Sequence, residues 1–233
     1  MPAAPYIVIA DAHVDESSAE AFFNLLGRIE ASGVRVIFLG DVFELWIAIP
    51  RYEQTMHRRF LDWSRRQREK PILIEGNHEF FVNQRYGGLL ETDGRTWDPP
   101  GWLEIGAVLA GHGDRINRHD WKYRSFRRVV RNPLAYALLK LLPFGPAIVE
   151  RIRQRMKGTN LEYRKHLPVE FLERLPESLR APADRKILIG HFHQESRFRG
   201  GQVLLLPSWR DGGRIAKLDA TTGNLQILLD SEL

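Results

Sequence analysis

The chain has 233 residues, of which 43% are hydrophobic, so it can form one globular domain with a full core. It has no cysteine, which excludes disulfides and thiolate metal ligands and is only weak support for a reducing compartment. Met1–Pro5 lacks the features of a signal peptide, and no uninterrupted apolar stretch reaches about 18 residues, so we expect no transmembrane helix. The net charge of +5 indicates an anionic partner, such as nucleic acid, a phosphorylated metabolite or a lipid surface.

Eight segments rich in Val, Ile and Leu are predicted to be strands. The first three and the fifth are nearly continuous aliphatic runs, which predicts burial on both faces in a layered α/β domain. Helical patterns lie between the early strands, so the first half is predicted to form βαβ units. The predicted strands are Tyr6–Ala10, Arg35–Leu39, Pro71–Glu75, Glu104–Ala110, Lys186–Ile189, Gln202–Leu206, Arg214–Leu218 and Leu225–Leu229.

Two helices are predicted between the first three strands. Ser17 and Glu20 have the spacing of a capping box, and the apolar face begins at once with Phe22. The second helix is predicted from Tyr52 to Arg68, with arginines on its outer face. Near the C-terminus, 211–213 and 221–224 have the composition of turns between short strands.

The stretch 115–165 differs from the rest of the chain. It holds fourteen lysines and arginines against three acids, and its apolar residues recur at helical spacing. Pro133, Pro143 and Pro146 divide it into two or three short helices. We expect a basic helical cap, inserted in a single domain over 1–233, that covers a lipid or lies on an anionic membrane. The alternative is a helical hairpin that only packs on the sheet.

Five short polar clusters each end an apolar run. Loops at the carboxyl ends of strands in an open α/β sheet converge on one crevice, so these clusters can meet in space. Carboxylate, amide and imidazole groups suit Mn²⁺, Fe or Zn²⁺. Singly, such residues are ordinary turn and cap residues, but together they have no shared structural reason. The clusters are Asp11-Ala-His13, Gly40-Asp41, Gly76-Asn77-His78-Glu79, Gly111-His112-Gly113-Asp114 and Gly190-His191-Phe192-His193.

The order and type of these donors allow two divalent ions bridged by one carboxylate, for which Asp41 is the candidate. Two such ions can clamp a phosphoryl group and activate water for in-line attack. Asn77 would ligate through its amide oxygen, whereas His78 stays free to donate a proton to the leaving oxygen or to bind a phosphate oxygen. We expect Mn²⁺, although Fe and Zn²⁺ accept the same ligands.

The remaining histidines and the acidic residues beside the clusters are not predicted to bind metal. Four acidic residues are predicted to orient imidazoles rather than to bind metal, namely Glu44, Glu75, Glu79 and Asp114. Three histidines lie in basic sequence contexts and are predicted to be surface residues, namely His57, His119 and His166.

The five clusters resemble the D-x-H, G-D, G-N-H-[DE], G-H and G-H-x-H motifs of calcineurin-type metallophosphoesterases, over Ile7 to His193. The resemblance implies an α/β (α+β) fold, a four-layer αββα sandwich, with a dinuclear metal centre. His78, with Asn77 beside it, matches the family's proton-donor position. The implied ligands are Asp11, His13, Asp41 and His193 for one ion, and Asp41, Asn77, His112 and His191 for the other.

A narrower resemblance is to the UDP-2,3-diacylglucosamine hydrolases of lipid A synthesis. Gly40–Ile47 is similar to their G-D-[LV]-F-E-x-W-I motif, and the residues after His112 resemble their helical cap. This resemblance implies hydrolysis of UDP-2,3-diacylglucosamine to UMP and 2,3-diacylglucosamine 1-phosphate. By position, the residues that would line the sugar and lipid are Phe80, Asp120, Tyr123, Phe126, Lys157 and Asn160.

Two departures from that narrower family leave alternatives open. His78-Glu79 stands where the commonest form of that family has Arg-Asp, and 156–160 lacks its Ser/Lys-rich tract. The chain is therefore a divergent hydrolase of the same lipid or a paralogue acting on another phosphorylated amphiphile. A second reading is a general phosphatase or phosphodiesterase for soluble nucleotides or other phosphate esters.

A nucleic-acid-processing protein has less support, because the basic cap is interleaved with aliphatic residues rather than with aromatic ones that stack on bases. A non-catalytic scaffold is disfavoured by the complete set of seven ligands. We expect a cytoplasmic enzyme that docks peripherally on the inner membrane and acts on a phosphorylated glycolipid or nucleotide.

Overall fold

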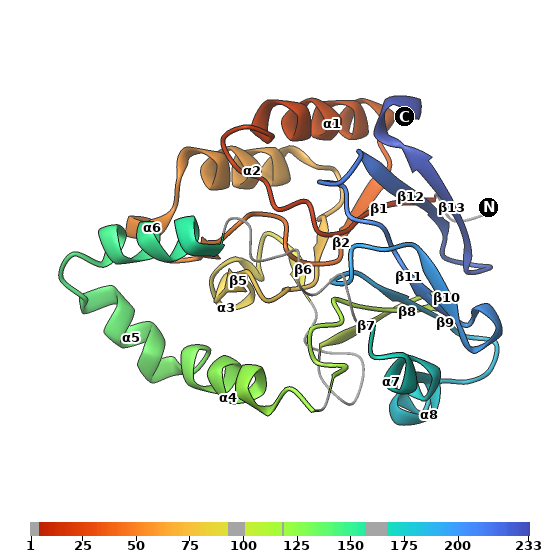
Figure 1. The fold of residues 1–233 in the computed structure, drawn as a ribbon. Coiled ribbons are helices and arrows are strands. Elements are labelled where there is room, and N and C mark those ends of the chain that lie inside the picture. The colour runs from red at the N-terminus through yellow and green to blue at the C-terminus, as the bar shows by residue number, and fades with distance from the viewer. Residues whose placement is uncertain (1–4, 93–100, 118, 157–166) are drawn as a thin grey trace.

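The structure is a computed structural model that describes residues 5–92, 101–117, 119–156 and 167–233. Two sheets pack face to face, and helices cover both outer faces (Figure 1). On one side lie α1 (Ala19–Ser32) and α2 (Thr55–Arg66), and on the other α7 (Val169–Glu173) and α8 (Leu175–Leu179). The predicted four-layer αββα sandwich is confirmed.

The first sheet has the strand order β13-β12-β1-β2-β4-β6. Its aliphatic strands β1, β2 and β4 are parallel and are joined by α1 and α2, as the predicted βαβ units require. β12 pairs antiparallel with both β1 and β13. The strands are β1 (Tyr6–Ile9), β2 (Arg35–Phe38), β4 (Ile72–Leu73), β6 (Glu91–Thr92), β12 (Arg214–Asp219) and β13 (Asn224–Leu229).

The second sheet has the order β10-β11-β9-β8-β7, with β8, β9 and β11 parallel. The single strand predicted over Glu104–Ala110 is wrong, because Gly106, at φ +58°, turns the chain and makes a hairpin. The apolar residues on both arms hid that turn. The strands are β7 (Trp102–Ile105), β8 (Val108–Gly111), β9 (Lys186–Ile189), β10 (Ser196–Phe198) and β11 (Val203–Leu205).

The core between the sheets holds the site's strands in place. Val8, Ile37 and Ile72 of the first sheet pack against Leu188 and Leu204 of the second, all in one buried cluster. Burial of aliphatic side chains on both faces explains why these strands read as continuous Val, Ile and Leu runs. A small extra sheet, not predicted, pairs β3 (Trp46–Ile47) in parallel with β5 (Glu79–Phe80).

Three helices occupy the described part of 115–165, and we call them the cap helices. They are α4 (Trp121–Val130), α5 (Pro133–Leu141) and α6 (Gly145–Met156). Asn132 caps α5 by accepting a hydrogen bond from Ala135 N at 2.8 Å, and Pro133 occupies its first position. The helices form an arc beside the sandwich, with α6 on the side of α2 (Figure 1). The cap boundaries at 115 and 165 stay a prediction.

The remaining helices are short, and the predicted helix Tyr52–Arg68 begins later than expected. A 3₁₀ turn, Pro50–Tyr52, precedes α2, and α3 (Val82–Tyr86) follows β5. Within the described residues, no single helix has both the length and the apolarity to cross a membrane. One pair of these described helices, Pro133–Leu141 and Gly145–Gln154, is together long and apolar enough by length and composition alone, but the two are bent by 114° to each other.

Candidate metal centre

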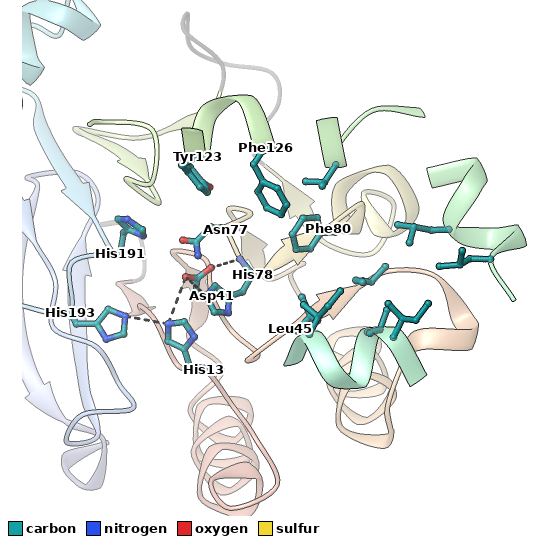
Figure 2. A pocket seen from close by; sticks show the side chains of 17 residues that line it. His13, Asp41, Leu45, Asn77, His78, Phe80, Tyr123, Phe126, His191 and His193 are labelled. Atoms are coloured by element: carbon teal, nitrogen blue, oxygen red, sulfur yellow. Dashed lines mark hydrogen bonds and ion pairs between the residues drawn. The ribbon is translucent and has the colours of Figure 1, made fainter. Parts of the chain in front are cut away.

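The predicted ligands meet at one end of both sheets. Asp11 and His13 follow β1, Asp41 follows β2, and the loop after β4 carries Asn77 and His78. From the second sheet, His112 follows β8, and His191 and His193 follow β9. Figure 2 shows His13, Asp41, Asn77, His78, His191 and His193 turned toward one another. The site therefore lies where the two sheets meet.

Short distances between donor atoms define the centre. His13 Nε2 lies 3.2 Å from His193 Nε2 and 3.7 Å from Asp41 Oδ2. Asp41 Oδ2 lies 3.4 Å from His112 Nε2, which in turn lies 3.0 Å from Asn77 Oδ1. Asp41 is thus at the middle of the arrangement.

Three groups among the described residues have donor atoms that all lie within 4.8 Å of one another: Asp11, His13 and His193; His13, Asp41 and His78; and Asp41, His112 and His191. Buried carboxylates among facing imidazole nitrogens are a donor set that fits divalent transition ions. Asp41 belongs to two of the groups, as a bridging carboxylate would.

Backbone strain is concentrated at these residues. Non-glycine residues with positive φ are uncommon, and they cluster at functional sites. Five of the seven predicted ligands have φ between +40° and +65°, namely Asp11, His13, Asp41, His191 and His193. The surrounding structure must stabilise this strained backbone at all five residues, and it thereby fixes the directions of their side chains.

Two glycines let the loops after β2 and β4 touch. A Cβ on Gly76 would overlap the Asp41 carboxylate, and one on Gly40 would lie 2.7 Å from Gly76 Cα. Gly40 also has φ +88°, which favours glycine. The close approach lets His78 N donate to Asp41 Oδ1 at 2.9 Å.

Glu79 holds the backbone of the site. Its fully buried carboxylate accepts hydrogen bonds from Asp41 N (2.8 Å), Val42 N (2.7 Å) and Gly76 N (2.8 Å). The prediction that Glu79 orients an imidazole is therefore wrong in its target: the carboxylate fixes two loops instead. Burial and the nearby Asp41 raise the pKa of Glu79 to about 7.

Backbone carbonyls orient two of the imidazoles. His78 Nδ1 donates to Glu44 O at 2.5 Å and His112 Nδ1 donates to Leu39 O at 2.7 Å, because a carbonyl can only accept. Both rings therefore present Nε2 to Asp41.

Acidic side chains stand beside two other rings. Glu44 Oε2 lies 3.8 Å from His13 Nδ1, beyond hydrogen-bond distance, so its orienting role stays a prediction, and Arg210 Nη1 pairs with the same oxygen at 2.7 Å. Asp211 Oδ2 lies 3.1 Å from His193 Nδ1 and was missed, because the composition of 211–213 indicated only a turn. Glu75 and Asp114 bond to cap arginines instead of imidazoles.

Electrostatics divide the titratable groups into charged and neutral forms. Burial raises the pKa of Asp11 well above its usual value. Burial acts the same way on Asp41, but His112, His78 and His13 outweigh it and hold its pKa well below the usual value. Burial opposes protonation of His112, yet Asp41 raises its pKa to about 10. Burial, together with His112, lowers the pKa of His191 to about 3.

An apolar cavity of about 360 Å³ opens from the centre (Figure 2). Its polar end is made by His13, Asp41, Asn77, His78, His191 and His193. Its apolar wall comes from the core and from all three cap helices: Leu45, Ile47, Phe80, Phe126, Val130, Leu139, Leu142, Ile148, Val149 and Ile152. We call this cavity the groove.

The structure brings three predicted substrate residues to the groove and one beside it. Phe80, Tyr123 and Phe126 line the groove. Asp120 lines a smaller pocket that Asn77 also lines, and it caps α4 by accepting a hydrogen bond from Tyr123 N at 2.9 Å. Lys157 and Asn160 lie outside the described residues.

The prediction for one surface histidine is wrong. His57 is buried, stacked on Trp46 with ring centroids 5.5 Å apart, and its Nδ1 accepts from Gln54 N at 2.9 Å. The arginines around it in the sequence hid a position on the inner face of α2. His119 is exposed as predicted, and His166 lies outside the described residues.

Comparison with known proteins gives consistent relatives. The family model for calcineurin-like phosphoesterases matches residues 4–207. A UDP-2,3-diacylglucosamine hydrolase from Pseudomonas entomophila is 28% identical over 200 residues and covers 81% of both chains. One from Azotobacter vinelandii is 26% identical over 234 residues, covering 92% of this chain and 95% of its own. Among solved structures, a Thermotoga maritima protein matches with a TM-score of 0.45 at 16% identity, over 97% of this chain and 98% of its own.

Proposed function

Since this chain belongs to the calcineurin-like phosphoesterase family and is a metal-dependent hydrolase, we propose that it cleaves the pyrophosphate of UDP-2,3-diacylglucosamine or a closely related phosphorylated amphiphile. The products would be UMP and 2,3-diacylglucosamine 1-phosphate. The relatives named for this activity support the proposal at 26–28% identity.

The groove is the observation that carries the proposal. A cavity that joins a polar donor cluster to a wall of aliphatic and aromatic side chains suits a substrate with phosphates at one end and acyl chains at the other. A soluble nucleotide has no group that would desolvate Leu139, Leu142 or Ile148. The cap arginines and lysines add positive charge for two phosphates.

Seven residues would hold the two ions: Asp11, His13, Asp41, Asn77, His112, His191 and His193. When bound, the ions polarise the phosphoryl oxygens and lower the pKa of water so that it can attack at neutral pH. We expect Mn²⁺, with Fe or Zn²⁺ as the alternatives.

His78 would supply the proton that leaves with the departing phosphate. Its Nδ1–H is committed to the Glu44 carbonyl, so only Nε2, 3.9 Å from Asp41 Oδ2, faces the reacting groups. The ring must therefore be protonated at Nε2 before cleavage. Asn77, beside it, would position the phosphoryl group through its amide.

The outer face of the cap helices would rest on an anionic membrane. Leu134, Leu138, Leu141 and Phe144 are 59–82% exposed and do not line the groove. Exposed Lys140 and Arg151 lie on the same helices and would meet lipid phosphates. Docking there would let an acylated substrate enter the groove without crossing water.

The test compares three substrates with added Mn²⁺: UDP-2,3-diacylglucosamine in detergent, bis-p-nitrophenyl phosphate and single-stranded DNA. Release of UMP from the lipid, at a kcat/KM well above that for the small diester, supports the proposal. Turnover of the small diester with no UMP release would favour a general phosphodiesterase. Cleavage of the DNA would favour nucleic-acid processing and contradict the proposed substrate.

A further inference from the structure

The helix α4 has a polar face that contacts the loops of the metal centre, beyond the groove-lining role of Tyr123. Tyr123, Arg127 and Arg131 follow one another at four-residue spacing, which places them along one side of the helix and its C-cap. All three are partly buried against the loops of the metal centre, while their neighbours Arg124 and Arg128 are exposed. This polar side faces the third and fourth sequence clusters.

Arg131 contacts the third cluster on both sides of Asn77 and His78. Its Nη2 donates to Gly76 O, before the pair, and to Glu79 O at 2.7 Å, after it. Its Nη1 lies 3.3 Å from the Glu75 carboxylate. The guanidinium carbon also lies 5.2 Å from the ring centroid of Phe80.

Arg127 makes a similar contact with the fourth cluster. Its Nη1 lies 2.8 Å from Asp114 Oδ2, and the Tyr123 hydroxyl donates to the same oxygen. Asp114 is buried two residues after His112. The side chains of Arg127 and Asp114 are only 19% and 4% exposed, so the pair is a largely buried ion pair rather than a surface one.

We propose that Arg131 is a positioning residue: it fixes the 76–79 loop in the shape that presents Asn77 and His78, with Arg127 doing the same for the loop after His112. The inference rests on the proposed roles of Asn77 and His78. The loop is then held from both sides, by the Glu79 carboxylate within the sandwich and by Arg131 from the cap.

The planar fork of arginine is what this position requires. One guanidinium serves two carbonyls and a carboxylate at once, whereas a lysine ammonium on a flexible stem would keep the charge and lose the fixed geometry. The first cap helix and the catalytic loop therefore form one unit. A substrate bound against Phe80 would therefore be held in a fixed position relative to Asn77 and His78, because Arg131 contacts both Phe80 and the loop.

The first test is amide hydrogen exchange, which needs no activity. Arg131→Met keeps the stem beside Phe80 and removes the guanidinium, and Arg128→Met on the same helix is the matched exposed control. We expect exchange in a peptide covering 75–82 to rise at least about tenfold in Arg131→Met, with the peptides of β1 and α1 unchanged. Exchange like that of Arg128→Met, or a rise spread over the whole chain, would overturn the inference.

The second test is turnover of bis-p-nitrophenyl phosphate, which is too small to need the groove. We expect kcat of Arg131→Met to fall about ten- to a hundredfold with KM within about twofold, and Arg131→Lys to recover part of the loss. Equal kcat in both variants and the wild type would count against a positioning role. Failure of the wild type to release UMP from the lipid would refute the substrate alone, since the exchange result does not depend on it.

Discussion

At the scale of single residues, the carboxylate of Glu79 is the support on which the loops carrying Asp41 and Asn77 rely. It is fully buried and accepts from three backbone donors. Glu79→Ala would leave Asp41 N, Val42 N and Gly76 N without an acceptor, at roughly 1–3 kcal/mol each. We expect a loss of about 3 kcal/mol or more in the free energy of unfolding, measured by urea titration. Glu79→Gln keeps one acceptor oxygen and should lose clearly less; equal losses in the two variants would contradict this account.

Substitutions of His78 and Asp41 should have different effects on metal content and turnover. Asp41 is central to the donor cluster, so Asp41→Ala should lose bound metal and activity together. His78→Ala should keep both ions and lose about a hundredfold or more in kcat, within the usual range for general acid catalysis. The measurements are elemental analysis and steady-state kinetics of each variant. Loss of one ion in His78→Ala would show that His78 is a metal ligand, which its place in one donor group allows.

His57 should make the fold sensitive to acid. Burial, helped by the charge of Arg153, lowers its pKa from 6.5 to about 3, so the folded protein keeps the ring neutral while the unfolded chain protonates it near pH 6.5. Stability from this residue is present above pH 6.5 and is lost as pH falls from about 6.5 toward 3.

The check is the thermal midpoint at pH 7.5 and pH 5 for wild type and His57→Gln. We expect the wild-type midpoint to fall more between these two pH values than that of the variant, which carries no titrating ring. An equal fall in both proteins would show that other groups set the acid sensitivity.

At the scale of helices and strands, the sequence pattern predicted long strands that are buried on both faces. It did not predict short strands or the turn inside an apolar run. The parallel strands β1, β2 and β9 are buried on both faces, so their aliphatic runs identified them within a residue or two. The hairpin β7–β8 was missed because its two-residue turn, Gly106 and Ala107, contains no polar side chain and does not interrupt the apolar pattern. β3 and β5 have two residues each, too few for any periodicity.

The same limit applies to the site. The donors could be predicted because each lies within four residues of the end of a strand, as Asp41 does after β2 and His191 after β9. Their supports could not, since Glu79, Arg131 and Asp211 act through contacts between distant segments that no local pattern records.

The two faces of α5 should have separate functions. Leu134, Leu138 and Leu141 lie outward, whereas Leu139 lines the groove. Changing the three outward leucines to serine should lower binding to phosphatidylglycerol vesicles at least about tenfold. Each leucine that enters the membrane contributes up to about 1.5–3 kcal/mol to the binding free energy. Hydrolysis of the small diester should be unchanged.

Val169→Ser on α7 is the matched control, since this valine is also half exposed but lies on a helix outside the cap helices. Vesicle binding that survives the triple substitution would refute membrane docking through this face. A monomer-dimer shift in that variant would instead identify a second copy of the chain as its occupant.

At the scale of the whole molecule, the centre joins the two halves of the sandwich. Asp11, His13, Asp41 and Asn77 come from loops of the first sheet, whereas His112, His191 and His193 come from the second. These loops meet through buried carboxylates and imidazoles. Burial disfavours their charged forms, yet their mutual contact lowers the pKa of Asp41 and raises that of His112. Ions held by ligands of both sheets would therefore stabilise the packing of one sheet on the other, and not only the loops.

Metal removal should then lower the stability of the entire fold. A ligand at a hundred times its Kd adds about 2.7 kcal/mol, which corresponds to roughly 5–10 °C in the thermal midpoint of a chain this long. We expect Mn²⁺ to raise the midpoint of chelator-treated protein by at least that amount in one cooperative transition. Asp41→Ala should show little of this shift, because it removes the carboxylate shared by two donor groups. A wild-type midpoint that does not move with Mn²⁺ would mean that no ion links the sheets.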